Sequence, residues 1–146
     1  MPKHEGLRSP YDKKVGGLYH LGRLFDKIRR HQAGCLPEDL RTNYGLAMGL
    51  DGHLYSFLGL EFKDLEDRIA QGGTDEEIAE WIFARGLRPN RMQTRIWNEC
   101  SRKFGWNDFI TKYLEKYKAE AGHADRTDIL TSFDAIVADE GHELPR

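Results

Sequence analysis

The chain has 146 residues, of which 39% are hydrophobic and 32% are charged, and its formal net charge is −2. This length and composition are typical of one folded domain with its own core and exclude a disordered chain. Because no apolar run approaches the ~20 residues that span a bilayer and the start lacks the apolar stretch of a signal peptide, we expect a cytoplasmic protein that does not enter membranes.

The charges alternate in sign along the chain. Residues 1–50 hold nine Lys or Arg against five Asp or Glu, and residues 85–118 hold nine against three. Residues 51–84 hold two against nine, and residues 119–146 hold two against seven. This pattern predicts pairing between acidic and basic elements, within a monomer or between the subunits of a homo-oligomer, and argues against a dedicated nucleic-acid-binding protein.

Helical spacing dominates the first half of the chain after an irregular, polar segment at residues 1–16. A first helix that ends at Gly34 is predicted by apolar residues at 3, 4 and 3 spacing, namely Leu18, Leu21, Phe25 and Ile28. Residues 35–53 contain Pro37 and three glycines, so we expect a short helix followed by a long loop. Only residues 53–60 resemble a strand, and they lack a partner strand.

Helix caps mark the second half of the chain. A helix with Phe62, Leu65 and Ile69 is expected to end at the glycine pair Gly72 and Gly73. Capping boxes are predicted for the next two helices, at Thr74 with Glu77 and at Asn90 with Gln93. Asn107 and Thr127 are the predicted caps of the last two helices.

These elements predict an all-α fold, an irregular bundle of five to seven short helices in a single domain that spans residues 1–146. The absence of alternating apolar and polar runs excludes a sheet of any size. Residues 139–146 are expected to form a loose tail.

Several stretches resemble a known family. They are Arg8 to Gly17, Leu24 to Arg29, Gln71 to Ile78, the pair Trp97 and Asn98, Phe104 to Trp106, and Phe133 to Gly141. Together they resemble the bacterial family catalogued as domain of unknown function 5069, over nearly the whole chain. The resemblance implies no activity, cofactor or catalytic residue.

The leading functional hypothesis is a non-catalytic domain that binds a small anion or an interaction partner. Arg8, Lys13 and Lys14 lie just before Gly16 and Gly17 and the predicted first helix. A helix N-terminus favours anions, glycine allows close approach to the backbone, and Lys or Arg neutralises a phosphate or carboxylate. No established phosphate-binding motif is present, so the alternative is that the glycines only turn the chain into the helix.

Two further hypotheses stay open. The first is a small enzyme that acts on a phosphorylated or carboxylated metabolite, with His20 as acid or base beside Asp12 or Tyr11. The second is a helical module that docks on a protein partner through its charged blocks.

No metal or cofactor is predicted. The six histidines form no H-x-x-x-H or H-E-x-x-H motif, and Cys35 and Cys100 form no C-x-x-C pair. The acidic tail with Asp139, Glu140 and His142 is expected to be solvated rather than to hold a metal.

Overall fold

The protein is all helical over residues 4–144, the part of the chain that the computed structural model describes. Its elements follow in chain order: α1 (Leu21–Gln32), α2 (Glu38–Arg41), α3 (Leu50–Phe57), α4 (Phe62–Ala70), α5 (Asp75–Arg85), α6 (Arg91–Ser101), α7 (Thr111–Glu120) and α8 (Ser132–Asp139). The all-α, single-domain prediction is confirmed, although the eight helices within these residues exceed the predicted five to seven. None of the helices between residues 4 and 144 is long and apolar enough to cross a bilayer.

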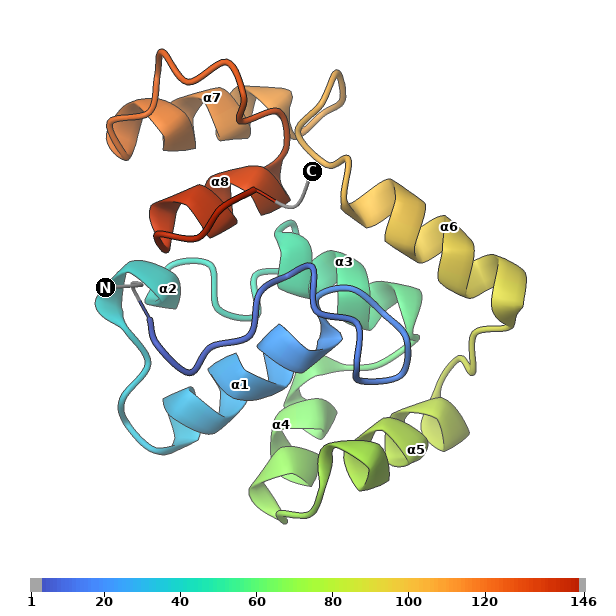
Figure 1. Cartoon of the computed structure of the whole chain (residues 1–146). Coiled ribbons are helices and arrows are strands. Elements are labelled where there is room, and N and C mark those ends of the chain that lie inside the picture. The colour runs from blue at the N-terminus through green and yellow to red at the C-terminus, as the bar shows by residue number, and fades with distance from the viewer. Residues whose placement is uncertain (1–3, 145–146) are drawn as a thin grey trace.

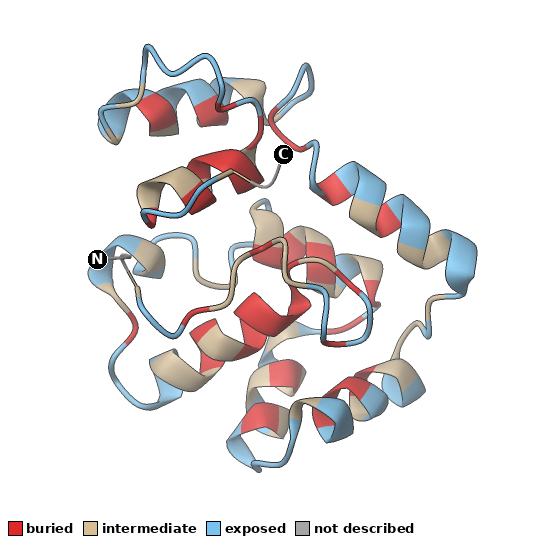
Figure 2. Cartoon of the chain, in the orientation of Figure 1, coloured by how far each residue is buried: buried red, intermediate tan, exposed pale blue. Residues whose placement is uncertain are grey.

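Helix α1 carries the centre of the main core (Figure 1) and packs against α4, which in turn packs against α5. Its apolar face, with Leu21, Leu24, Phe25 and Ile28, is fully buried. Each such side chain contributes about 1.5–3 kcal/mol when it leaves water. Buried residues gather on α1, α3 and α8, while α5 and α6 turn their outer faces to solvent (Figure 2).

Helices α7 and α8 pack against each other as a separate pair above α1 and α3 (Figure 1). They share a small second core with Leu114, Ile129 and Ala135. Polar contacts tie the pair to the rest of the molecule, because Arg23 of α1 forms a 2.8 Å ion pair with Glu140, and both side chains are buried. Helix α8 and its buried cap residue Glu140 thus occupy the first two residues of the predicted tail, and residues 145 and 146 lie outside the described part.

The structure differs from the predicted elements at three places. Helix α1 begins at Leu21 rather than directly after Gly17, so Leu18 is buried ahead of the helix. The predicted loop contains α3, whose cap Gly49 offers no capping side chain. The caps predicted at Asn107 and Thr127 are wrong.

The observed cap positions of the last two helices lie three and four residues further along the chain. Ile110 precedes α7, and Asn107 adopts a left-handed backbone with φ of 51°. Thr131 caps α8, where its hydroxyl accepts from the backbone N–H of Asp134. By contrast, both predicted capping boxes, on α5 and α6, are confirmed.

Gly52 allows the loop before α3 to lie directly on that helix. A Cβ at this position would lie 2.1 Å from the carbonyl oxygen of Ala47. We therefore expect Gly52→Ala to lower the free energy of unfolding by about 1–3 kcal/mol, the usual cost of overpacking. Chemical denaturation measures the loss.

Gly49→Ala is the matched control, because Gly49 lies in the same loop with negative φ and its added Cβ would meet nothing closer than 3.4 Å. Equal stability of the two variants would contradict the close packing of this loop on α3.

Candidate functional site

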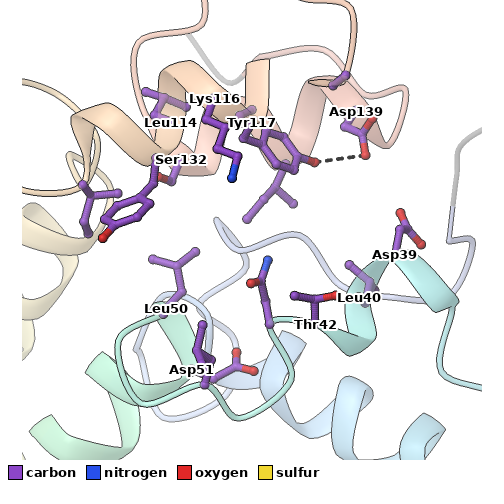
Figure 3. Close-up of a pocket in the computed structure, with 18 of the residues that line it drawn as sticks. Asp39, Leu40, Thr42, Leu50, Asp51, Leu114, Lys116, Tyr117, Ser132 and Asp139 are labelled. Atoms are coloured by element: carbon purple, nitrogen blue, oxygen red, sulfur yellow. Dashed lines mark hydrogen bonds between the residues drawn. The ribbon is translucent and has the colours of Figure 1, made fainter. Parts of the chain in front are cut away.

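A cleft of about 730 Å³ separates the α7–α8 pair from α1 and the segment that runs from α2 into α3. Figure 3 shows its upper wall with Lys116, Tyr117 and Ser132 and its lower wall with Thr42 and Leu50. Pockets that bind small molecules are usually about 300–1,000 Å³ in volume, so the cleft has a suitable size. His20, Lys27 and Asp51 also line it and bring buried titratable side chains to the cleft.

His20 holds an unusual backbone conformation at the start of α1. It is the cap residue of the helix, with φ of 74° and ψ of −19°, in the left-handed region that glycine and asparagine prefer. Its backbone N–H donates to the carbonyl of Pro10 at 2.9 Å, and its own carbonyl accepts from Leu24. These bonds hold the strained residue and fix its ring at the junction of α1, α3 and α8.

The buried carboxylate of Asp51 joins His20 to Lys27. Asp51 Oδ1 lies 2.7 Å from His20 Nε2, and Asp51 Oδ2 accepts from Lys27 Nζ at 2.7 Å and from the backbone N–H of Gly45 at 2.9 Å. The three side chains are at most 6% exposed. Such burial is tolerated because each charge has an opposite partner and hydrogen bonds.

The protonation state of this group follows from its surroundings. Burial alone would raise the pKa of Asp51, but the charge of Lys27 and the hydrogen bond from His20 outweigh it and hold the pKa well below its usual range. The carboxylate is therefore ionised and accepts, and we assign the proton of the neutral imidazole to Nε2. Nδ1 then carries the lone pair.

His20 is neutral near pH 7 for a physical reason. Burial lowers the pKa of its ring below the usual 6.5, and the nearby cations Lys27 and Arg23 act in the same direction. This outweighs the effect of Asp51, which favours the charged ring. Nδ1 is buried and has no hydrogen-bond partner in the described part of the chain.

A stacked aromatic ring covers His20 from the side of α8. The ring of Phe133 lies nearly parallel to the imidazole, with 6.3 Å between the ring centroids. Phe133 is itself fully buried and makes edge contacts with Tyr11 and Tyr19. Access to His20 therefore depends on how α8 sits above it.

The structure gives His20 other partners than the enzyme hypothesis expected. The structure pairs His20 with Asp51, not with Asp12 or Tyr11. Tyr11 donates its hydroxyl to Asp134 at 2.7 Å, and Asp12 accepts from the backbone N–H of Lys14 at 2.9 Å.

The residues of the proposed anion site lie apart from the cleft. Arg8 is bound to two carboxylates, Asp26 at 3.0 Å and Asp75 at 2.8 Å. Lys13 and Lys14 are exposed, and the ammonium of Lys13 lies over the ring of Tyr19.

The glycine pair of that site has a turning role. Gly16 and Gly17 both have positive φ, and the carbonyl of Gly17 accepts from the side chain of Asn98. Since α1 begins only at Leu21, the helix N-terminus that the anion hypothesis invoked does not lie next to these glycines.

A comparison with protein families decides the chain's membership. The model described as Domain of unknown function (DUF5069) matches residues 4–142. The chain belongs to the DUF5069 family. The resemblance predicted from the sequence is thereby confirmed, and a search of curated proteins found no match.

Two residues of the site in this DUF5069 chain, Asp51 and Lys27, were not predicted from the sequence. Asp51 fell in the segment expected to be a loop, and Lys27 belonged to a basic run that ends at His31. The available signal was the helical spacing of Leu50, Leu54 and Phe57, which places Asp51 in the first turn of a helix. In the described residues, no group of three or more His, Cys, Asp or Glu is arranged to hold a metal ion.

We expect NMR to find His20 neutral, with its proton on Nε2, at pH 7. Because its pKa is lowered, the ring should gain a second proton only at a pH below 6.5. The free energy of unfolding should correspondingly fall as the pH drops below 6.5, since the unfolded chain binds the proton first. Nitrogen-detected imidazole spectra across a pH titration measure both the tautomer and the pKa, and a doubly protonated ring at pH 7 would contradict the assignment.

We expect Asp51→Asn to lower the free energy of unfolding by about 3–5 kcal/mol, because it leaves the buried ammonium of Lys27 without a counter-ion. Asp125→Asn, at an exposed position, should change it by less than about 0.5 kcal/mol. Urea denaturation of the two variants at pH 7 makes the comparison. A loss of less than about 1 kcal/mol for Asp51→Asn would mean that Lys27 finds another partner or is neutral.

Proposed function

We propose that this DUF5069 protein is a small enzyme that acts on a carboxylated or phosphorylated metabolite, with His20 as its general base. The observation that carries the proposal is the unpaired Nδ1 of a neutral, buried histidine that lines a cleft of ligand size. A buried acceptor without a partner costs about 1–3 kcal/mol. A substrate or a water molecule that donates to Nδ1 would recover this cost.

Each member of the buried group has a role in such a reaction. His20 Nδ1 accepts a proton from the substrate or from an attacking water, and the ring becomes an imidazolium. Asp51, already bonded to Nε2, orients the ring and stabilises this positive charge. Lys27 balances the charge of Asp51 in the resting state and keeps the carboxylate ionised.

Substrate reaches His20 from the cleft only when the side chains above the ring move, because Nδ1 is shielded in the structure. The α7–α8 pair is suited to such movement. It has its own small core and contacts the rest of the chain through a small set of groups: the Arg23–Glu140 ion pair, the hydrogen bond from Tyr11 to Asp134, and the ring of Phe133 beside His20. Movement of α7 and α8 away from α1 would expose the imidazole to substrate, and their return would exclude water from the site during proton transfer.

The non-catalytic anion-binding domain is the second candidate. The observation in its favour is that Lys13 and Lys14 are exposed and have no ion pair with another residue in 4–144. Its ligand would bind outside the cleft, so mutations separate the two candidates.

The test begins with thermal unfolding of the protein against a panel of carboxylates, sugar phosphates, nucleotides and inorganic phosphate, since a ligand of the native state raises its stability. Stabilising compounds are then incubated with the protein, and NMR in D₂O follows conversion or exchange of hydrogen for deuterium. We expect turnover that falls by at least about 100-fold in His20→Gln, the usual size of a general-base contribution.

His123→Gln, at a histidine that does not line the cleft, is the control and should keep full turnover. Joint replacement of Lys13 and Lys14 by Ala tests the second candidate, because it should abolish ligand binding only if the anion site lies there. Binding without turnover in the wild type, lost in the lysine variant and kept in His20→Gln, would overturn the enzyme proposal.

A further inference from the structure

We infer that the cleft takes a hydrophobic monocarboxylate, with its carboxylate on Lys116 and its apolar part against Leu46, Met48 and Tyr113. The inference rests on the proposed use of the cleft and names the class of molecule that it binds. It goes beyond the proposal because it separates carboxylates from phosphates.

Three exposed hydrophobic side chains line the cleft and favour a ligand with an apolar group. Leu46, Met48 and Tyr113 are 46%, 72% and 61% exposed, and all three line the cleft. Leu46 and Met48 belong to the loop before α3, and Tyr113 belongs to α7, so both walls of the cleft contribute apolar side chains. A flexible Met beside an aromatic ring accommodates acyl or aryl groups of varied shape.

Lys116 provides the positive charge that the carboxylate of the ligand would contact. Its ammonium projects from α7 into the cleft (Figure 3). Lys116 forms no ion pair with any other residue between 4 and 144, unlike the cations beneath it: Arg23 is paired with Glu140 and Lys27 with Asp51. Lys116 is therefore the cation of the cleft that remains available for a ligand.

The remaining charges limit the ligand to one negative charge. The cleft is lined by the cations Arg23, Lys27 and Lys116 and by the carboxylates Asp39, Asp51, Glu120 and Asp139. With three cations against four carboxylates, the summed charge of the lining opposes any anion, and it opposes a phosphate dianion twice as strongly as a monocarboxylate. The direct bond to Lys116 and the burial of an apolar group outweigh this repulsion more readily for a single negative charge. Asp139 and Asp39 lie together at one end (Figure 3), which leaves the end near Leu50 for the apolar group.

Isothermal titration at pH 7 tests the inference with butanoate, hexanoate, hexan-1-ol and hexyl phosphate. We expect hexanoate to bind about tenfold more tightly than butanoate, since burial of two more methylenes has about this effect. Hexanoate should also bind at least about tenfold more tightly than hexan-1-ol, which has no charge, and than hexyl phosphate. Equal binding of hexanoate and hexan-1-ol, or tighter binding of hexyl phosphate, would overturn the inference.

Two exposed lysines provide a pair of variants. Lys116→Gln should weaken hexanoate about tenfold and leave hexan-1-ol unchanged, whereas Lys63→Gln, on α4 and outside the cleft lining, should leave both unchanged. Unchanged hexanoate affinity in Lys116→Gln would overturn the role of this lysine. Circular dichroism confirms that both variants remain folded.

The outcome for the ligand class is independent of the outcome for catalysis. Carboxylates that bind through Lys116, with no compound of the panel converted, would support this inference and overturn the enzyme proposal. Conversion of a phosphorylated metabolite that depends on His20, without carboxylate binding, would do the reverse.

Discussion

The carboxylate of Asp51 is the interaction on which the centre of this protein depends. It accepts hydrogen bonds from the imidazole of His20, the ammonium of Lys27 and the backbone N–H of Gly45. Asp51 therefore connects α3 to the cap residue and the middle of α1, and also to the loop that precedes α3. A charge of this kind is stable away from water only when it has an opposite charge and hydrogen-bond donors. The same requirement that stabilises the fold therefore sets the tautomer of His20 and leaves its Nδ1 without a hydrogen-bond partner in the described residues.

The charge blocks seen in the sequence become specific pairs within one chain. Arg8 and Arg29 from the basic first block both bind Asp75 from the acidic second block, and Arg23 binds Glu140 from the acidic last block. These contacts are partly or fully buried and hold the N-terminal segment and α8 against α1. Alternation of charge thus predicted pairing, but not which residues pair, because the partners are 46 to 117 positions apart in the chain.

The sequence predicted the features that depend on residues close together in the chain, but not the contacts between residues that only the fold brings together. Both capping boxes join residues three positions apart and are confirmed, and the apolar face of α1 follows from its own spacing. Helix α3 was missed because its glycines suggested a loop, although Gly52 is there for the close approach of Ala47. The partner of His20 was missed for a different reason: Asp51 is 31 positions away, and no spacing rule relates the two.

His20 breaks several local rules at once, and this is the strongest reason to place function at this residue. A histidine occupies a left-handed position that suits glycine, its ring is buried beside two cations, and one ring nitrogen has no partner in the described residues. Each feature alone costs free energy of the order of 1–3 kcal/mol, and a glycine at this position would avoid all three. The bond to Asp51 gives Nε2 a structural role, but no contact in the described residues gives one to Nδ1. The proposed reaction would use this nitrogen, since a base must be neutral, oriented and unoccupied before its substrate arrives.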